Sequence, residues 1–244
     1  MTESRMPYPV RVDASLDPSL SRWLWLVKWL LLIPHYLILV FLWFAFLIVT
    51  VIAFFAILFT TRYPRGLFDF NVGVLRWSWR VSYYGYSALA TDRYPPFTLA
   101  DISDYPARLQ LDYPQQLNRW LPLVKWLLAV PHYLLVGALV GSGYAATSGM
   151  ENDRIVDYSA PGVIGACVLI AAIALLFTAR YPTGLYDFVV GINRWNYRLV
   201  TYVALMTDRY PPFRLDQGSN DPEGPAEPAA AGQERGPQGQ GEPA

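Results

Sequence analysis

Long apolar runs alternate with short polar segments along the chain, and the whole arrangement occurs twice. The first run, Leu37 to Phe59, contains no charged residue and, counted from Trp23, reaches 37 residues. At roughly 1.5 Å per residue, one helix of that length would extend about 55 Å, whereas the hydrocarbon core of a bilayer is about 30 Å thick. One straight span cannot use the whole run. The pattern therefore predicts an integral membrane protein whose run folds back on itself.

The second copy indicates where the run turns back. Its apolar sequence stops at Gly149, passes through the polar insert Met150 to Gly162 and resumes from Val163 to Phe177. We interpret the insert as the loop of a helical hairpin. By analogy we expect a tight turn near Trp43 to Phe46 in the first copy, although neither Gly nor Pro marks it. Two hairpins make about four spans in a plasma membrane.

Basic residues favour the hairpins and place both termini in the cytoplasm, because every Lys and Arg except Arg154 then lies on the side of the N-terminus, at span ends or in the segments after them. The alternative is one long kinked span from Trp23 to Thr60, with Gly66 to Ala90 as the return crossing. It would leave four arginines of the later segments deep in lipid, at about 2.5 kcal/mol or more each. Either topology crosses twice per copy, so we expect the copies to be related by an axis along the membrane normal.

Short alternating segments flank each membrane unit and predict strands outside the bilayer. Tyr8 to Asp13 and Tyr105 to Asp112 begin the units, whereas Pro96 to Asp101 and Pro212 to Asp216 end them. We expect each beginning to pair with the end of its own unit. The fold class is then mainly α, with two tandem repeats and a few short strands. The domains are repeat 1 (1–101), repeat 2 (102–216, insert 150–162) and an acidic tail (217–244), whose Gly, Pro, Gln and Glu content predicts disorder.

Composition supports the membrane class and excludes others. The 244 residues are 54% hydrophobic and 16% charged, and nineteen basic side chains balance nineteen acidic ones. The arginines are spread between apolar runs rather than gathered on a polar surface, which argues against nucleic acid as a partner. Cys167 is the single cysteine, so disulfides and Cys-based metal sites are excluded. The polar first 22 residues predict no cleaved signal peptide.

A repeated segment after each apolar run carries the charges that concern function. In both copies Tyr-Pro ends the span, Gly permits a turn, and an amphipathic helix follows at the interface. One Asp and two Arg then occur at spacings of seven and four, which places them on one narrow stripe of that helix. These residues are Asp69, Arg76, Arg80, Asp187, Arg194 and Arg198.

Two interpretations of this stripe stay open. An interfacial helix carries Arg on its polar edge because Arg snorkels, and Asp suits its first turn. Alternatively, paired guanidinium groups attract an external anion, so the stripe binds the headgroup of an anionic phospholipid or glycolipid. Gly73 and Gly191 lie on the same stripe and leave it open for close approach.

Two further motifs are duplicated. K-W-x-x-x-x-P-H-Y contains Lys28 and Lys125, which we expect to snorkel to the headgroups, and the two histidines of the chain, His35 and His132. Each histidine meets a carbonyl freed by the preceding proline or a headgroup, or, as a secondary site, the two form a pair across the repeat axis for a metal or a proton. T-D-R-Y-P-P-F is typical of a helix stop, with its Asp and Arg bonding locally.

Known catalytic motifs are absent from the sequence. It contains no G-x-S-x-G, no H-E-x-x-H and no Gly-rich phosphate loop. We therefore expect no catalytic residues, no cofactor and no metal.

The combination of K-W-x-x-x-x-P-H-Y, R-Y-P-x-G-L-[FY]-D-F-x-V-G, R-W and T-D-R-Y-P-P-F resembles the bacterial membrane-protein family Domain of Unknown Function 4389, found largely in actinobacteria. The resemblance covers about residues 7 to 216. It implies a membrane location and an envelope role, and some mycobacterial relatives are linked to glycolipid handling. It implies no catalytic residues, and the insert at Met150 to Gly162 departs from the first repeat.

We expect a non-enzymatic membrane protein that binds anionic phospholipid or glycolipid as an accessory to envelope lipid handling. A second hypothesis is a scaffold whose small sheet or acidic tail recruits a protein partner. A third is a small channel or transporter that uses the His35 and His132 pair.

Overall fold

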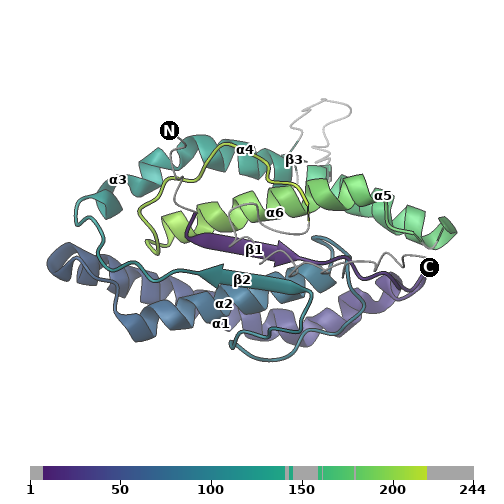
Figure 1. The fold of residues 1–244 in the computed structure, drawn as a ribbon, viewed down its shortest axis with the longest axis horizontal. Helices are drawn as coiled ribbons and strands as arrows, with labels where there is room; N and C mark the ends of the chain where they lie inside the picture. Colours follow the sequence, from purple (N-terminus) through teal and green to yellow (C-terminus); the bar gives the residue numbers. More distant parts are fainter. Residues whose placement is uncertain (1–7, 141–142, 145–158, 161, 179, 219–244) are drawn as a thin grey trace, which may run out of the picture.

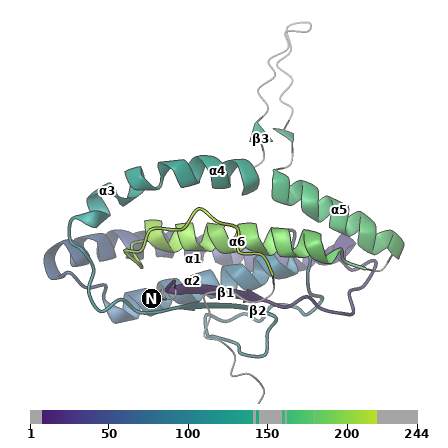
Figure 2. The same ribbon diagram turned by 45° about the horizontal axis from the view of Figure 1, so that its top comes forward.

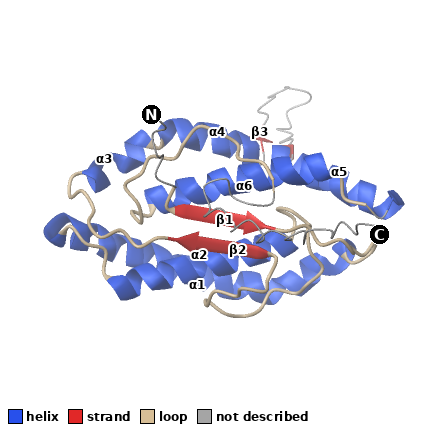
Figure 3. Cartoon of the chain, viewed as in Figure 1, coloured by secondary structure: helices blue, strands red, loops and turns tan. Residues whose placement is uncertain are grey.

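The chain forms three curved layers in the computed structural model, which describes residues 8–140, 143–144, 159–160, 162–178 and 180–218. A two-stranded sheet forms one face, two helices lie behind it, and the most apolar helices lie on the far side (Figures 1 and 2). The main elements are β1 (Val10–Ala14), α1 (Trp25–Thr60), α2 (Arg65–Tyr84), β2 (Ala107–Leu111), α3 (Leu121–Leu128), α4 (Val130–Val140), α5 (Val163–Thr178) and α6 (Thr183–Val203). The fold is mainly helical, as predicted (Figure 3).

Helix α1 runs without interruption through the first apolar run, so the predicted turn near Trp43 to Phe46 is wrong. No Gly, Pro or polar residue there competes with the helix, and a continuous helix satisfies every backbone group internally. Pro34 is accommodated inside the helix, which ends where Thr61 adopts a left-handed conformation with φ 59°. Among the described residues, α1 is the one helix long and apolar enough to cross a membrane.

The second repeat follows the same path in three pieces. Helices α3, α4 and α5 lie end to end along one arch (Figure 2), rather than pairing side by side as a hairpin. The break between α3 and α4 at Ala129 lies two residues before Pro131, which lacks a donor for the helix ladder. At the junction of α4 and α5 the chain leaves the arch through β3 (Gly143–Tyr144) and β4 (Ser159–Ala160), which pair antiparallel. Most of the predicted insert, 150–158, lies outside the described residues.

The sheet joins the two repeats to each other. β1 pairs antiparallel with β2, and Val12 faces Leu109 at the centre of the register. The two residues are equivalent in the duplication, so a pseudo-twofold axis passes between them, perpendicular to the sheet. The locations of two of the four predicted strands are therefore confirmed, but the predicted pairing within each unit is wrong. The proline-rich segments 96–101 and 212–216 form no strands.

Each strand also packs against the middle-layer helix of the other repeat, β1 on α6 and β2 on α2. Further bonds cross between the repeats: the Tyr83 hydroxyl lies 2.8 Å from that of Tyr186, and the Tyr8 hydroxyl donates to the carbonyl of Arg209, 201 positions away. Burial raises the pKa of Tyr83, and the Tyr186 hydroxyl acts in the same direction. The predicted units 1–101 and 102–216 therefore interlock into one body. The predicted tail, from residue 219, lies outside the described residues.

Helices α2 and α6 form where the amphipathic helices were predicted, but they do not lie exposed at an interface. Most of their residues are buried between the sheet and the outer helices. Gly73 permits this packing, because a Cβ there would lie 2.8 Å from the Cβ of Leu99. The expected close approach is confirmed, and protein rather than lipid makes it.

Candidate functional site

The inner arginine of each predicted stripe binds a strand. Arg76 Nε donates to the carbonyl of Leu109 at 3.0 Å, and Arg194 Nε donates to the carbonyl of Val12 at 2.9 Å. Arg194 also donates to the carbonyls of Asp216 and Gly218. A two-stranded sheet has two unpaired edges, and these guanidinium groups occupy acceptors on them. Both arginines therefore hold the repeats together.

The outer arginine of each stripe binds the segment that ends its repeat. Arg80 donates to the carbonyls of Ala100 and Thr98, and Arg198 Nη1 lies 2.5 Å from Asp216 Oδ2. Both side chains are buried, and burial lowers the pKa of Arg80 from its ordinary value. At its arginines the stripe is thus turned toward protein. Its arginines meet protein acceptors.

The aspartates of the stripe take no part in this network. Asp69 pairs instead with Arg65 at 3.1 Å on an exposed turn, with both side chains more than half accessible. Asp187 is half-buried in the first turns of α6. The structure therefore does not bring the three predicted residues of either repeat together as one anion site.

The duplicated lysines are buried, which corrects the expectation that they snorkel. Lys28 Nζ lies 2.6 Å from the Thr91 carbonyl and 3.0 Å from Asp92 Oδ1. Lys125 makes the same contacts with Thr207 and Asp208, at 2.8 and 2.7 Å. T-D-R-Y-P-P-F thus clasps the first turns of the outer helix, and its Asp bonds over a long range rather than locally.

The two histidines belong to separate copies of this clasp. His35 Nδ1 accepts from Trp77 Nε1 at 3.0 Å, and its ring stacks on Phe97 with centroids 3.9 Å apart. His132 has matching contacts with tryptophan and phenylalanine of the second repeat. Each imidazole is enclosed within its own repeat, so the structure does not support the predicted pair across the axis. Among the described residues, no cluster of metal-ligating side chains occurs.

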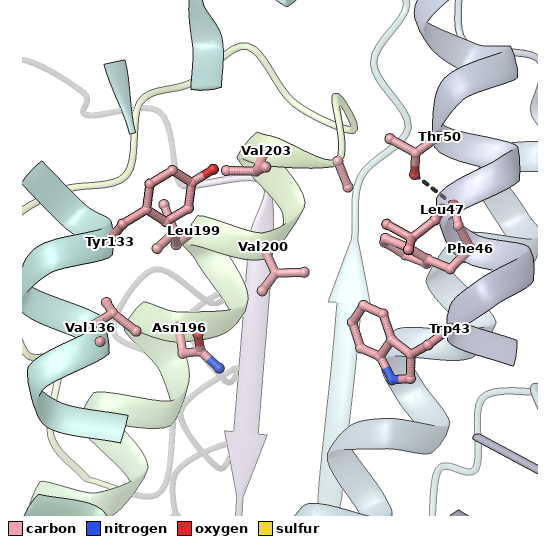
Figure 4. Close-up of a pocket in the computed structure, with 12 residues that line it drawn as sticks. Trp43, Phe46, Leu47, Thr50, Tyr133, Val136, Asn196, Leu199, Val200 and Val203 are labelled. Atoms are coloured by element: carbon pink, nitrogen blue, oxygen red, sulfur yellow. Dashed lines mark hydrogen bonds between the residues drawn. The ribbon is translucent and has the colours of Figure 1, made fainter. Parts of the chain in front are cut away.

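A groove lies where the outer helices approach each other over the middle layer. We call it the axial groove, and it comprises two adjoining cavities of about 460 and 730 Å³ that share Trp43, Leu47, Asn196 and Val200. Figure 4 shows α1 on one side, with Trp43 and Phe46, and Tyr133 and Val136 of α4 on the other. Helix α6 lies between them. The sequence pattern alone did not indicate this groove.

The walls and floor of the axial groove differ in chemistry. Mostly apolar side chains of α1 and α4 form the walls, together with the hydroxyl-bearing Tyr36, Thr50 and Tyr133, whereas α2 and α6 contribute Ser78, Ser82, Asn193 and Asn196. Ser78 accepts a hydrogen bond from Trp43 Nε1 at 3.1 Å. None of the described residues that line the two cavities is a Lys, Arg, His, Asp or Glu. The groove can therefore hold an apolar molecule with an uncharged hydrogen-bonding group.

One sequence signal for the groove was available. R-W-S-W-R and R-W-N-Y-R place Ser78 and Asn196 at equivalent positions between the same flanking residues. A small polar residue thus stands at the centre of each of two otherwise apolar or arginine-bearing segments. The importance of Ser78 and Asn196 follows only once the fold places both beside the pseudo-twofold axis.

Exposed apolar side chains cover the outer helices along their whole length. Helix α1 forms the first arch, and α3, α4 and α5 form the second. The exposed side chains extend from Leu26 to Phe59 on the first arch and from Leu123 to Phe177 on the second. An exposed arginine stands just beyond each end of each arch: Arg22, Arg62, Arg119 and Arg180. Among the described residues, none of these four has a side-chain hydrogen bond or ion pair. Because the arches run in opposite directions (Figure 1), the four arginines mark the corners of the apolar face.

Comparison with family models identifies the class of this duplicated helical chain. A model for a domain of unknown function, DUF4389, matches residues 22–98 and 154–214, together more than half of the chain. The protein belongs to this family, in agreement with the resemblance of its motifs. The second matched region leaves out the second copy of K-W-x-x-x-x-P-H-Y. Neither the curated proteins nor the solved structures contain a match.

Proposed function

We propose that the protein is a non-enzymatic, lipid-binding membrane protein whose two arches lie within one leaflet and whose corner arginines bind anionic headgroups. The observation that carries this proposal is the apolar face, which extends along α1 and along the described parts of α3, α4 and α5 and is bounded by Arg22, Arg62, Arg119 and Arg180. Its physiological role would be that of an accessory in envelope lipid handling. We thus assign the binding of anionic lipid to the exposed corner arginines and no longer to the buried arginines of the stripe.

Length argues against a simple crossing by α1. A helix of 36 residues extends about 54 Å, and a hydrocarbon core of about 30 Å would enclose it only at a tilt near 55°. Tilts of membrane helices lie between about 0 and 40°. Even at a tilt of about 40°, apolar side chains as far apart as Leu26 and Phe59, which are 45% and 75% exposed, would not both reach the core, because about 50 Å of helix separates them. Lying in the leaflet allows the whole face to meet lipid.

The corner arginines fit anionic headgroups because they lie at the margins of this face and no described residue forms an ion pair with them. Basic side chains next to an anionic leaflet contribute about 1 kcal/mol each. A guanidinium also binds phosphate in a bidentate manner. The same positions suit the aqueous edge of the bilayer, since Trp23 and Trp120 follow Arg22 and Arg119 and are 65% and 66% exposed.

Spin-label depth measurements in nanodiscs test the proposed position of α1 within one leaflet. Single labels replace Leu30, Phe41 and Phe59, which are exposed along α1, and the accessibility of each to oxygen and to a polar nickel reagent gives its depth. We expect Phe41 to be deepest and both ends to be shallow on the same side of the bilayer. A steady change of depth from one headgroup layer to the other would overturn the in-leaflet proposal in favour of a span. Water-like accessibility at all three would indicate that a protein partner covers the face.

Headgroup binding is tested with a variant in which Arg22, Arg62, Arg119 and Arg180 are changed to Gln. Native mass spectrometry of protein from vesicles of phosphatidylglycerol and phosphatidylcholine should show retained phosphatidylglycerol falling several-fold. Arg65→Gln is the matched control, because Arg65 is exposed but already paired with Asp69. An equal loss in the control, or no loss in the quadruple variant, would refute the assignment to the corners.

A further inference from the structure

We infer that the axial groove binds one uncharged, hydroxyl-bearing lipid, with its polar group on Ser78 and Asn196 and its hydrocarbon chains leaving between α1 and α4. The inference rests on the proposed function, in which the arches lie within one leaflet, because the ligand then enters the groove laterally from the bilayer. It identifies a second class of lipid, distinct from the anionic headgroups at the corners.

The polar end of the ligand is defined by the floor of the groove. Ser78 accepts from Trp43 Nε1 at 3.1 Å, which fixes its oxygen and leaves its own proton to donate. Asn196 is half-buried and contributes an amide with both donor and acceptor capacity. Asn193 already donates to the carbonyls of Val189 and Ser87. A hydroxyl group, which both donates and accepts, complements Ser78 and Asn196 together.

Charge excludes the common anionic phospholipids from this site. Within the part of the chain that the structure describes, the residues that line the two cavities include no cation that could compensate a phosphate. Removing a charged group from water without such compensation is costly, whereas an uncharged hydroxyl needs only hydrogen-bond partners. The unpaired corner arginines lie beyond the ends of the arches and do not line the groove. The two lipid classes are thus separated in space.

The apolar part of the ligand is defined by the walls and their continuity with the lipid-facing surface. Val40, Phe44 and Leu47 line the groove and are also 60% exposed or more. A chain in the groove is therefore in contact with the bilayer along its length and need not pass through water. A cavity of about 460 Å³ also falls within the range of about 300–1,000 Å³ that is typical of small-molecule sites.

Gly137 provides a way to fill the groove without disturbing the core. It lines the groove on α4, and a Cβ added there would meet no other atom within 4 Å. Gly137→Trp should therefore occupy space that the ligand uses, whereas Gly137→Ala adds one methyl group and leaves the groove open. Both changes also raise helix propensity.

The test uses full-length protein in nanodiscs that contain either diacylglycerol or phosphatidylglycerol with the same diazirine-labelled acyl chain. After irradiation, cross-linked peptides are mapped by mass spectrometry. We expect diacylglycerol to label peptides that contain Trp43, Tyr133 or Asn196 at least fivefold more than phosphatidylglycerol does. Gly137→Trp should abolish that excess and Gly137→Ala should keep it. A Ser78→Ala/Asn196→Leu variant should bring the two lipids to similar labelling.

Several outcomes would overturn the inference. In the unmodified protein, these are equal labelling by the two lipids, or stronger labelling by phosphatidylglycerol than by diacylglycerol. In Gly137→Trp, the contrary outcome is undiminished labelling by diacylglycerol. Cross-links that place a second copy of this chain or another protein helix in the groove would also overturn it. Depth profiles of α1 are recorded for the same samples. An in-leaflet profile with any of these outcomes rejects the groove ligand alone, whereas a transbilayer profile rejects the proposed function itself.

Discussion

Arg194 and Val12 lie at opposite ends of the chain, yet the guanidinium Nε of one is 2.9 Å from the carbonyl oxygen of the other. The duplication repeats the relationship with Arg76 and Leu109, at 3.0 Å. Each repeat therefore protects the sheet edge contributed by the other. The arginines that the sequence predicted as a lipid site instead fix how the two halves interlock.

The two equivalent arginines should differ in their effect on stability. Arg194→Ala leaves the carbonyls of Val12, Asp216 and Gly218 without this donor in a fully buried site, so we expect a loss of about 3 kcal/mol or more in the free energy of unfolding. Arg76 is half-buried and has one such bond, so Arg76→Ala should cost about 1 kcal/mol. Denaturant titration in detergent, followed by tryptophan fluorescence, measures both. Equal losses would contradict the assignment.

The lysine clasp should be sensitive to removal of one partner. Lys28→Met leaves Asp92 without its buried cation and the Thr91 carbonyl without its donor, so we expect destabilisation by about 3 kcal/mol. Lys28→Met combined with Asp92→Asn should recover part of that loss, because no uncompensated charge remains.

Arg65→Ala is the control for the clasp, since the Arg65–Asp69 pair is exposed and should contribute less than about 0.5 kcal/mol. Thermal unfolding of the four proteins in one detergent gives the comparison. A double variant that is as unstable as Lys28→Met, or a control that is equally damaging, would show that buried charge is not the cause.

Substitution of the glycines of the middle layer by alanine should change stability by different amounts, according to the space around each glycine. A Cβ at Gly73 would lie 2.8 Å from the Cβ and 3.1 Å from the carbonyl oxygen of Leu99, so Gly73→Ala should destabilise by about 1–3 kcal/mol. At Gly191 the nearest atom is 3.4 Å away, an ordinary contact, and Gly191→Ala should be nearly neutral. Gly66 has open space, so Gly66→Ala should stabilise by up to about 1 kcal/mol. Any other order of the unfolding midpoints would show that the close contact between Gly73 and Leu99 does not determine the cost of the substitution.

The segment between β3 and β4 gives a prediction about sides of the membrane. These strands leave the second arch on the side away from the sheet (Figure 2), and the sequence between them includes Glu151, Asp153, Arg154 and Asp157. Because charged side chains are costly in hydrocarbon, we expect this sequence to be reached from the side of the membrane opposite the termini.

A cysteine at Asp153, in a chain with Cys167→Ser, tests this expectation with a membrane-impermeant maleimide added to intact cells. Labelling without permeabilisation is expected. A cysteine at Ser219, in the tail, should be labelled only after permeabilisation. Protection of both until the cells are opened would place the insert on the side of the termini and count against an arch that faces lipid.

Local patterns predicted the elements better than their partners. Alternation located the strands around Val12 and Leu109, and spacing located the helices that carry Arg76 and Arg194, because these signals depend on neighbouring residues. The pairing of β1 with β2 depends instead on residues about a hundred positions apart, and proline-rich ends offered a nearer partner with a similar pattern.

The helical hairpin was mispredicted for a related reason. Length excluded a straight span, and a turn near Trp43 was the simplest alternative, although no residue there breaks a helix. A helix that lies along a leaflet satisfies the same length limit without a turn. The axial groove was missed because Ser78 and Asn196 acquire a shared environment only when two helices from different repeats meet.

The bond between Tyr8 and Arg209 has a consequence for biosynthesis. The first strand emerges from the ribosome about two hundred residues before the helix and carbonyl groups that hold it. Contacts between residues so distant in sequence form slowly. Until they form, the N-terminal segment is exposed to proteases and to non-native partners. The cell must therefore protect nearly the whole nascent chain until translation is almost complete.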